Sequence, residues 1–444
     1  MKLDEALAYL LSLGHETLTI KLGLQNTETL LAALGNPERA YRSVQIAGTN
    51  GKGSTAAFLD SICRAAGIRT ALFTSPHLVS ITERIAVDGA PISETQFALL
   101  TNEVKTAAEE LVARGELQTL PTFFEQVTAI ALLAFARAQV ELAILETGLG
   151  GRLDSTTAAR AGVVVITRID MDHQEYLGHT LPEIAAEKAA IIQPDVTAIV
   201  APQKNEALEV INRRCETVGV RPRLAGAHRE LRTAGAEKLL RTTTDGRAVV
   251  SFTTGSAQYD DVTLALRGLH QVENAAAAIA TAEALSEQGL DISREAIIHG
   301  IETATHRGRL ELWPGPPQFL FDGAHNPAAA KALRDYLDEF IDEPIVMIFG
   351  AMRDKALSEM MATLFPAAAN VILTTLDNPR AASIDELMLA LPHAVANTKI
   401  ARTANVSEAL ERARELSASN GIVCVTGSLH LIGEAQKLLQ KPDR

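Results

Sequence analysis

Short apolar runs alternate with amphipathic segments along the first part of the chain. Ser54–Ala66 has its apolar residues at helical spacing, whereas the runs around it are only four or five residues long and resemble strands. These runs are Val44–Gly48, Thr70–Phe73, Leu142–Leu145 and Val163–Thr167. Strands that are separated by helices form βαβ units, so the pattern predicts a parallel sheet.

The pattern changes to a β-rich one between about Arg221 and Leu266. Strand-like segments flank Asp245-Gly246 there, and an Asp-Gly pair favours a type I′ hairpin turn. We therefore predict a β-rich appendage on the first domain.

A second α/β segment follows a stretch rich in Gly and Pro, Thr305–Pro317, which is typical of a linker. Its predicted strands are Phe319–Phe321, Ile345–Gly350, Asn370–Thr375 and Gly421–Gly427. A chain of this length is expected to form two or three domains. We predict a two-domain α/β protein, with a larger domain over residues 1–304 and a smaller one over residues 310–444.

The first chemically suggestive segment follows the strand that ends at Gly48. It reads Thr49-Asn50-Gly51-Lys52-Gly53-Ser54 and leads into a helix. Glycines let backbone amides surround a phosphate, Lys52 offers a cation, and the helix N-terminus adds partial positive charge. The spacing departs from the strict Walker pattern, so an ordinary Gly-rich turn remains the alternative.

Polar residues also follow the other three predicted strands of this domain. Ser75 follows the second strand, Glu146 ends the third beside a Gly-rich turn, and the fourth leads to Asp170, Asp172 and His173. Each could be structural, as a turn, a hydrogen-bonded buried glutamate or a packed histidine. Ligands of parallel sheets bind outside the carboxyl ends of the strands, and Mg²⁺ prefers oxygen ligands. Together the four ends favour a nucleotide and metal site.

Lys188 lies on the apolar face of a predicted helix. Thr180 and Glu183 form a capping box before it, and Lys188 is four residues from both Ile184 and Ile192. Burial would lower the pKa of the amine, and a neutral amine can act as a nucleophile or add CO₂ to become a carbamate. The pattern alone favours the alternative, a lysine whose stem is buried and whose ammonium reaches water.

The overall charge limits the partners. The chain has 444 residues, 41 basic and 54 acidic, with a net charge of -13. Such a surface repels phosphate backbones and anionic lipids, so we expect no binding to nucleic acid or membranes. An anionic substrate would need a local cluster of cations, loop amides or metal ions.

The cysteines and the N-terminal segment indicate the compartment. Cys63, Cys215 and Cys424 lie far apart, which argues against a disulfide framework or a structural zinc site and fits a reducing environment. Asp4 and Glu5 lie in the first turn of an amphipathic segment that does not resemble a signal peptide. We expect a cytoplasmic protein and, since nothing demands a partner subunit, a monomer.

Five segments in a fixed order carry a family resemblance. They are GTNGKGS from Gly48, SPHL from Ser75 with ERI from Glu83, ETGLGGRLDST from Glu146, DHQEYLGHTLPEIAAEK from Asp172, and DGAHNP from Asp322. The set resembles the dihydrofolate synthase/folylpolyglutamate synthase branch of the Mur ligase superfamily. Two segments depart from the family pattern. EKAAII replaces the usual EKAGII around Lys188, and HRGR replaces the usual WPGR, which leaves Arg307 and Arg309 as alternatives for one contact.

The resemblance implies an ATP-dependent amide ligase of folate biosynthesis. It implies that L-glutamate is added to dihydropteroate, to the glutamate tail of tetrahydrofolates, or to both, through an acyl phosphate. It also implies a P-loop-type ATPase domain and a smaller Rossmann-like C-terminal domain, which closes over ATP to supply Arg309 and Asp322.

Roles for individual residues follow from the same resemblance. Gly48–Ser54 would bind the ATP phosphates, Ser75, Glu146 and His173 would hold two Mg²⁺ ions, and Lys188 would be carbamylated beside them. Lys52, Lys188 and His173 are the residues expected to act in catalysis. Further nucleotide contacts are implied for Asn274, Arg309, Asp322 and His325, and pterin contacts for Thr122, Phe123, Phe124, Glu125, Leu153, Asp154 and Ser155.

Two other functions remain open at this point. A cell-wall UDP-muramoyl amino-acid ligase would share the phosphate machinery, although TFFE from Thr122 and ETGLGGRLD from Glu146 favour the folate branch. A P-loop NTPase that acts as a switch would hydrolyse ATP without an amino acid, and it would not require Lys188 or the DGAHNP segment.

Overall fold

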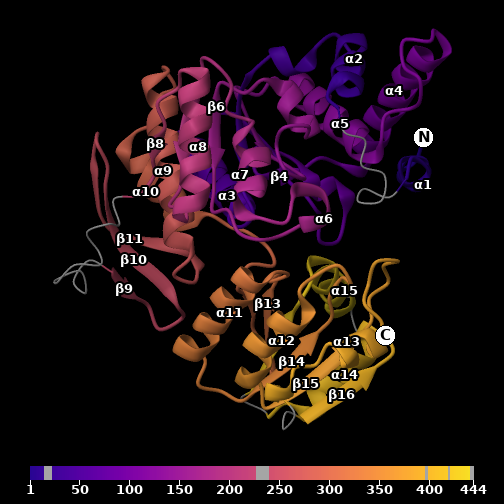
Figure 1. Cartoon of the computed structure of the whole chain (residues 1–444), viewed down its shortest axis with the longest axis vertical. Coiled ribbons are helices and arrows are strands. Elements are labelled where there is room, and N and C mark those ends of the chain that lie inside the picture. The colour runs from indigo at the N-terminus through magenta and orange to yellow at the C-terminus, as the bar shows by residue number, and fades with distance from the viewer. Residues whose placement is uncertain (15–22, 227–239, 396–398, 419–420, 441–444) are drawn as a thin grey trace.

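The computed structural model describes residues 1–14, 23–226, 240–395, 399–418 and 421–440. Two α/β bodies lie one above the other in Figure 1, with the chain up to about residue 304 in the upper one and the remainder in the lower one. The mixed α/β class and the parallel sheet that the sequence predicts are confirmed. Within the described residues, no helix combines the length and apolar character needed to cross a membrane.

The upper sheet has eight strands in the order β4-β3-β2-β5-β1-β6-β7-β8. The strands from β2 to β8 in this order are parallel, and β3 and β4 add antiparallel at one edge. Their bounds are β1 Arg42–Ala47, β2 Thr70–Phe73, β3 Ile85–Val87, β4 Ala90–Pro91, β5 Leu142–Glu146, β6 Val163–Ile166, β7 Thr197–Val200 and β8 Arg223–Leu224. The four strands that the sequence singled out are therefore neighbours, in the order β2-β5-β1-β6.

Helices cover both faces of this sheet because both faces of its central strands are apolar. In β6, Val163 and Val165 pack in the core with helices α3, α9 and α10, whereas Val164 and Ile166 face α7 and α8. A third cluster joins α1, α2, α4 and α5 to β2 and β5. The helices are α1 Leu3–Ser12, α2 Gln25–Ala33, α3 Lys52–Ala65, α4 Glu94–Ala113, α5 Phe123–Ala138, α6 Gln174–Leu177, α7 Leu181–Ala189, α8 Asn205–Val218, α9 Gln271–Glu287 and α10 Arg294–Thr303.

The predicted β-rich appendage is a three-stranded antiparallel sheet in the order β11-β10-β9. Its strands are β9 Leu240–Thr242, β10 Arg247–Thr253 and β11 Gln258–Arg267, and residues 227–239 of the predicted stretch lie outside the described residues. The prediction of a type I′ turn at Asp245-Gly246 is wrong. The amide of Gly246 donates to the carbonyl of Thr243 at 3.0 Å, and of the Asp245-Gly246 pair only Gly246 has a positive φ, of 76°. A four-residue connection needs one left-handed residue here, not two.

The lower domain is built on a six-stranded sheet in the order β12-β13-β17-β14-β15-β16, in which only the edge strand β12 is antiparallel. Apolar clusters fill both of its faces. The sequence did not predict β12, which lies inside the Gly/Pro-rich stretch, or β16, a half-exposed edge strand. The bounds are β12 Glu311–Trp313, β13 Gln318–Asp322, β14 Ile345–Phe349, β15 Asn370–Thr374, β16 Lys399–Thr403 and β17 Ile422–Thr426, with α11 Pro327–Phe340, α12 Leu357–Leu364, α13 Ile384–Leu389, α14 Val406–Leu416 and α15 Leu429–Leu439.

The two domains touch at several points. Leu78, in the segment after β2, packs against an apolar cluster of the lower domain. Its carbonyl oxygen lies where a side chain at Gly433 of α15 would begin. On the appendage side, the hydroxyl of Tyr336 in α11 donates to the carbonyl of Asp245 at 3.2 Å. The domain interface thus includes backbone as well as side-chain contacts.

Candidate active site

The loop between β1 and α3 packs so tightly that its glycines have no room for side chains. A Cβ at Gly48 would overlap the hydroxyl of Thr167, and one at Gly51 would overlap the side-chain oxygen of Asn274. A Cβ at Gly53 would lie 2.7 Å from Cε1 of His306. Gly51 also has a φ of 87°, which disfavours other residues. The amides of Thr49 and Asn50 donate to the carbonyl of Arg168 at 2.9 and 3.1 Å. This contact and the glycines hold the loop in one conformation directly before the N-terminus of α3, where a phosphate can bind.

Two lysines point at the carbonyl groups of this loop. The Nζ of Lys52 lies 3.2 Å from the carbonyl oxygens of both Gly48 and Thr49. The Nζ of Lys188 donates to the carbonyl of Gly48 at 2.8 Å. Lys188 is only 5% exposed, so the ammonium does not reach water, and the interpretation favoured by its pattern alone is wrong. Two lysine amines therefore meet at one loop that carries no carboxylate of its own.

Burial governs the protonation of Lys188. Loss of hydration lowers the pKa of this amine to about 7, and the charge of Lys52 acts in the same direction. The carboxylates of Asp172, Asp154 and Glu187 oppose the shift. At neutral pH a substantial fraction of the amine is therefore uncharged, which is the form that can add CO₂.

Glu146 and Ser75 meet beside the same loop. Glu146 ends β5 and is buried, and its Oε2 accepts the amide N–H of Ser75 at 3.3 Å. A Cβ at Gly53 would lie 3.5 Å from Oε2 of Glu146. Burial raises the pKa of the Glu146 carboxyl, and the nearby charge of Lys52 opposes that effect. A buried carboxylate at a phosphate loop is suited to a divalent cation.

His173 follows β6 and adopts a left-handed backbone conformation with a φ of 49°. Burial lowers the pKa of its imidazole to about 3, against the opposing charge of Asp172. The ring is therefore neutral at physiological pH, the form in which histidine ligates metals. In the described part of the chain, no three His, Cys, Asp or Glu side chains form a cluster that could hold a metal alone. A metal here would need hydroxyl, phosphate or water oxygens as well.

The residues expected to contact the nucleotide gather around the loop from several elements. Asn274 lies in α9 against Gly51. The charge of Arg309 acts on both Glu146 and Asp322, whereas Arg307 binds Glu83 at 3.3 Å and Gln436 at 2.6 Å. This geometry favours Arg309 over Arg307 as the cation at the site.

Asp322 and His325 belong to the turn between β13 and α11. The buried carboxylate of Asp322 accepts the amides of Leu310 and Ala324, both at 3.0 Å. His325 contacts the carbonyl of Gly323 through Nδ1 at 2.8 Å, and its Nε2 lies 3.5 Å from Oδ2 of Asp172. Asp322 therefore shapes the turn, and His325 reaches across to the N-terminal domain.

The residues expected to hold the pterin border the loop after Glu146. A Cβ at Gly148 would lie 2.5 Å from Cζ of Phe124, so the ring of Phe124 packs against this glycine. The guanidinium of Arg84 lies over the ring of Phe123. Thr122 and Glu125 form the capping box of α5, so both also have a structural role. The second group, Leu153–Ser155, follows the same loop.

Asp154 holds the loop after Glu146 in shape. Its carboxylate accepts the amides of Gly148, Leu149 and Thr156, at 2.8, 2.9 and 3.0 Å. These contacts use both carboxylate oxygens. Asp154 therefore stabilises the conformation of the loop through these three hydrogen bonds.

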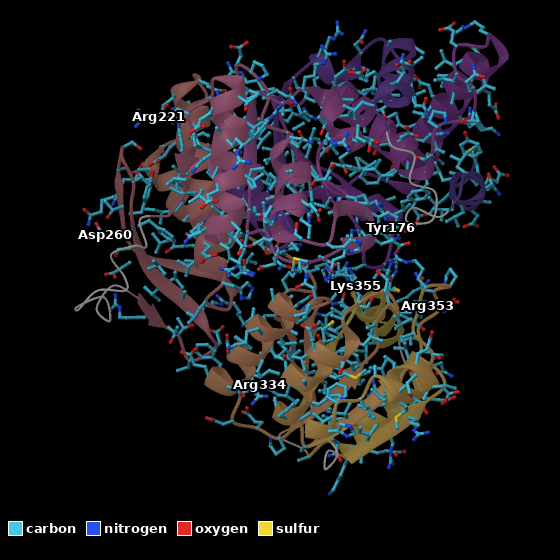
Figure 2. The ribbon with its side chains drawn as sticks, viewed as in Figure 1. Tyr176, Arg221, Asp260, Arg334, Arg353 and Lys355 are labelled. Atoms are coloured by element: carbon cyan, nitrogen blue, oxygen red, sulfur yellow. The ribbon has the colours of Figure 1, made fainter. Side chains whose placement is uncertain are left out.

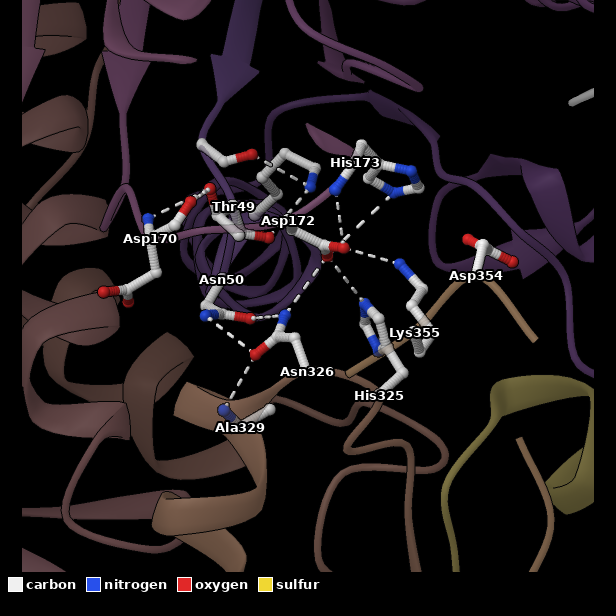
Figure 3. Close-up of polar contacts among 12 residues, drawn as sticks. Thr49, Asn50, Asp170, Asp172, His173, His325, Asn326, Ala329, Asp354 and Lys355 are labelled. Carbon is white, nitrogen blue, oxygen red and sulfur yellow. Dashed lines mark hydrogen bonds and ion pairs between the residues drawn. The ribbon is translucent and has the colours of Figure 1, made fainter. Parts of the chain in front are cut away.

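Sequence reasoning missed several residues of this region. Lys355 and Asn326 come from the lower domain, and together with His325 they surround Asp172 (Figure 3). Figure 2 shows Lys355 between the two domains. Lys355 lies late in the segment between β14 and α12, beyond the residues directly after a strand end where Ser75 and Glu146 were found. His306, whose Nδ1 lies 3.3 Å from the hydroxyl of Ser54, gave no comparable signal.

Replacing Gly51 by alanine is expected to abolish tight binding of ATP. The new Cβ would meet the side chain of Asn274 at a positive φ, and such strain costs roughly 1–3 kcal/mol. Titration with a fluorescent ATP analogue measures the affinity, and thermal unfolding measures the stability. Gly67→Ala is the matched control, because Gly67 also has a positive φ, of 76°, but faces open space. Equal affinities in the two variants would contradict the expected role of the loop.

Comparisons with known proteins identify relatives along nearly the whole chain. The Mur ligase middle domain matches residues 46–282, and the Mur ligase glutamate ligase domain matches residues 308–429. A dihydrofolate synthase/folylpolyglutamate synthase from Bacillus subtilis is 36% identical, over 96% of this chain and 97% of that protein.

Two similar solved structures add ligands to the comparison. Mycobacterium tuberculosis folylpolyglutamate synthase complexed with ADP has a TM-score of 0.90 at 32% identity and covers 100% of this chain and 99% of its own. The bifunctional folylpolyglutamate synthase/dihydrofolate synthase with Mn, AMPPNP and L-glutamate bound has a TM-score of 0.82 at 27% identity, with 99% and 98% covered.

Proposed function

Because this chain belongs to the dihydrofolate synthase/folylpolyglutamate synthase family of Mur ligases, we propose that its Gly48–Ser54 loop is the place where a carboxylate is activated by ATP. The protein is an ATP-dependent ligase that joins L-glutamate to a pterin or folate carboxylate. The observation that carries the assignment of residues is the adjacency of β2, β5, β1 and β6. It sets Ser75, Glu146, the loop and the Asp172-His173 pair along one edge of one sheet.

The reaction has two steps. A carboxylate is a poor electrophile, so one of its oxygens first attacks the γ-phosphorus of ATP, and the bond to ADP breaks. The amine nitrogen of L-glutamate then attacks the acyl carbon of the resulting acyl phosphate, phosphate leaves, and the nitrogen loses a proton. Dihydropteroate would give dihydrofolate, and a tetrahydrofolate would gain a glutamate in its tail.

The chain's own residues supply binding and charge stabilisation. Lys52, which contacts the carbonyls of Gly48 and Thr49, would turn to the phosphates when ATP is bound. Charge that develops on the transferred phosphoryl group is stabilised by such fixed cations and amides. From the lower domain, Arg309 and Asp322 would complete the nucleotide contacts, while Asn274 borders the loop from α9.

Ser75, Glu146 and His173 are the proposed protein ligands of two Mg²⁺ ions. Their hydroxyl, carboxylate and neutral imidazole suit a divalent cation that also keeps phosphate and water oxygens. Glu146 is buried, and its Oε2 accepts the amide N–H of Ser75 at 3.3 Å, so the carboxylate lies directly beside Ser75. When bound, Mg²⁺ neutralises charge on the phosphates. Lys188 is the proposed carbamate site, since burial holds the pKa of its amine at about 7.

The proposed pterin site borders the loop after Glu146. Phe124 offers aromatic surface next to Gly148, whereas Phe123 is buried beside the guanidinium of Arg84. Leu153, Asp154 and Ser155 follow the same loop. We also propose that the protein acts in the cytoplasm as a monomer. Its proposed partners are small molecules, not nucleic acid, and its proposed domains are residues 1–304 and 310–444. All three cysteines are free and buried, which agrees with a reducing compartment.

A single incubation tests the reaction. The protein is mixed with ATP, Mg²⁺, dihydropteroate and L-glutamate, and phosphate release and product mass are followed. We expect phosphate release that depends on both organic substrates and a product heavier by one glutamyl residue. A UDP-muramoyl substrate that replaces the pterin would indicate a cell-wall ligase, and ATP hydrolysis without either amino acid or pterin would indicate an NTPase switch.

A further inference from the structure

Three side chains of the lower domain converge on the carboxylate of Asp172 in the upper domain (Figure 3). The Nζ of Lys355 lies 2.5 Å from Oδ1, and the side-chain amide of Asn326 donates to Oδ2 at 3.2 Å. The Nε2 of His325 lies 3.5 Å from Oδ2. His325 and Asn326 belong to the turn before α11, and Lys355 to the segment after β14, so two separate loops meet one carboxylate.

This contact differs in burial from most ion pairs of the protein. The side chains of Asp172 and Lys355 are 7% and 8% exposed, whereas those of Lys331 and Asp335 in α11 are 67% and 56% exposed. Exposed pairs contribute little, but the loss of one partner from a buried pair leaves an uncompensated charge. The geometry between the domains therefore depends on Asp172 and Lys355 together.

The same carboxylate is linked to the site itself. Oδ1 of Asp172 accepts the amide N–H of His173 at 2.9 Å and so supports the left-handed backbone that presents this imidazole. A second link runs from Asn326 to the phosphate loop, where its side-chain nitrogen donates to Oδ1 of Asn50 at 3.0 Å. Movement of the lower domain would therefore displace both His173 and Asn50.

We infer that Asp172 is a positioning residue that holds the lower domain over the nucleotide site, with Lys355 as its principal partner. The expected effect on catalysis rests on the proposed function. The contact between the domains, of Asp172 with Lys355, rests on the geometry alone. Asp172 acts through the loops that it holds and need not touch ATP or either organic substrate.

The test compares Asp172→Asn, Lys355→Met and the double variant with wild type. Misplacement of catalytic groups by about 1 Å can cost roughly a hundredfold in rate, so we expect each single variant to lower kcat by about 10–100-fold. Affinity for AMPPNP is also expected to fall, because the proposed nucleotide contacts of Arg309, Asp322 and His325 move with the lower domain. Because both substitutions break one contact, the double variant should be no worse than the more impaired single variant.

Small-angle scattering with AMPPNP and Mg²⁺ gives a readout that is independent of turnover. We expect a larger radius of gyration for Asp172→Asn and Lys355→Met than for wild type. Asp354→Asn is the matched control, because Asp354 precedes Lys355 but pairs with Arg380 inside its own domain at 2.9 Å. It should leave both compactness and kcat unchanged. Thermal unfolding verifies that each variant is folded, and Lys355→Met tests the contact from the other domain.

Other outcomes would overturn the inference. Unchanged compactness in both variants would show that the contact does not hold the domains. Multiplicative losses of kcat, or a raised KM for L-glutamate in Lys355→Met alone, would show that Lys355 acts on a substrate instead. If wild type formed no glutamylated product, the proposed function would fail, whereas the scattering comparison would still decide whether Asp172 holds the domains.

Discussion

Glu146→Gln is expected to keep the fold and to lose Mg²⁺-dependent turnover by at least about a hundredfold, since a bound metal contributes several kcal/mol to such a transition state. Glu146 is buried at the end of β5, beside Lys52 and Ser75. Glutamine keeps the volume and can still accept the N–H of Ser75, but it removes the negative charge that a divalent cation requires. The loss should therefore appear in turnover and in the Mg²⁺ dependence, not in the stability.

The measurement is ADP release at saturating pterin and L-glutamate over a range of Mg²⁺ concentrations. Glu141→Gln is the matched control, because Glu141 precedes the same strand at its opposite end, where its Oε1 accepts the amide of Arg69 at 3.0 Å. Near-normal ADP release by Glu146→Gln would count decisively against the proposed metal site.

Lys188→Met should also abolish most activity, by about a hundredfold or more, because methionine cannot form the anionic carbamate that is proposed at Lys188 to support the metal ions. It should at the same time stabilise the protein at neutral pH. Burial lowers the pKa of Lys188 to about 7 in the folded state, whereas an unfolded lysine titrates near ~10.4. The unfolded chain therefore binds more protons between these values, and the stability of wild type rises with pH across that window.

Chemical denaturation from pH 7 to pH 10, without Mg²⁺ and CO₂, measures this effect. Methionine has no titrating group, so its advantage over lysine should shrink as the pH rises, by up to about 1.4 kcal/mol per pH unit. Addition of ¹³CO₂ to wild type should give a carbamate carbon signal that is absent from Lys188→Met. An advantage for methionine that does not change with pH would contradict the buried, neutral amine.

The sheet and its chemically important edge could be predicted because the signals are local. β2, β5, β1 and β6 are apolar runs with polar residues directly after them, and a parallel sheet necessarily gathers such ends at one edge. The order of these strands within the sheet depends on contacts between distant parts of the chain. Only the polar residues at the strand ends indicated that the four strands are neighbours. Edge strands such as β16 escaped because half-exposed strands have no continuous apolar run.

Lys188 shows the limit of periodicity. Its spacing from Ile184 and Ile192 placed it on the apolar face, but a helix pattern does not reveal whether another element covers the end of the side chain. Gly48, which accepts its hydrogen bond, is 140 residues earlier in the chain. Asp172 was identified as a residue at a strand end, but its pairing with Lys355 escaped for a related reason, because the contact between two domains leaves no periodic trace in either one.

The contact between Leu78 and Gly433 has a consequence for chimaeric proteins. The carbonyl oxygen of Leu78 occupies the space of a side chain at position 433, and Leu78 follows Ser75 by three residues in the sequence. A graft that exchanges C-terminal domains between relatives at the linker would therefore need a glycine at this position in the incoming helix. Any larger residue would clash with the backbone of Leu78 and displace the segment that carries Ser75. The two domains of a chimaera must therefore fit at this contact before their substrate preferences are compared.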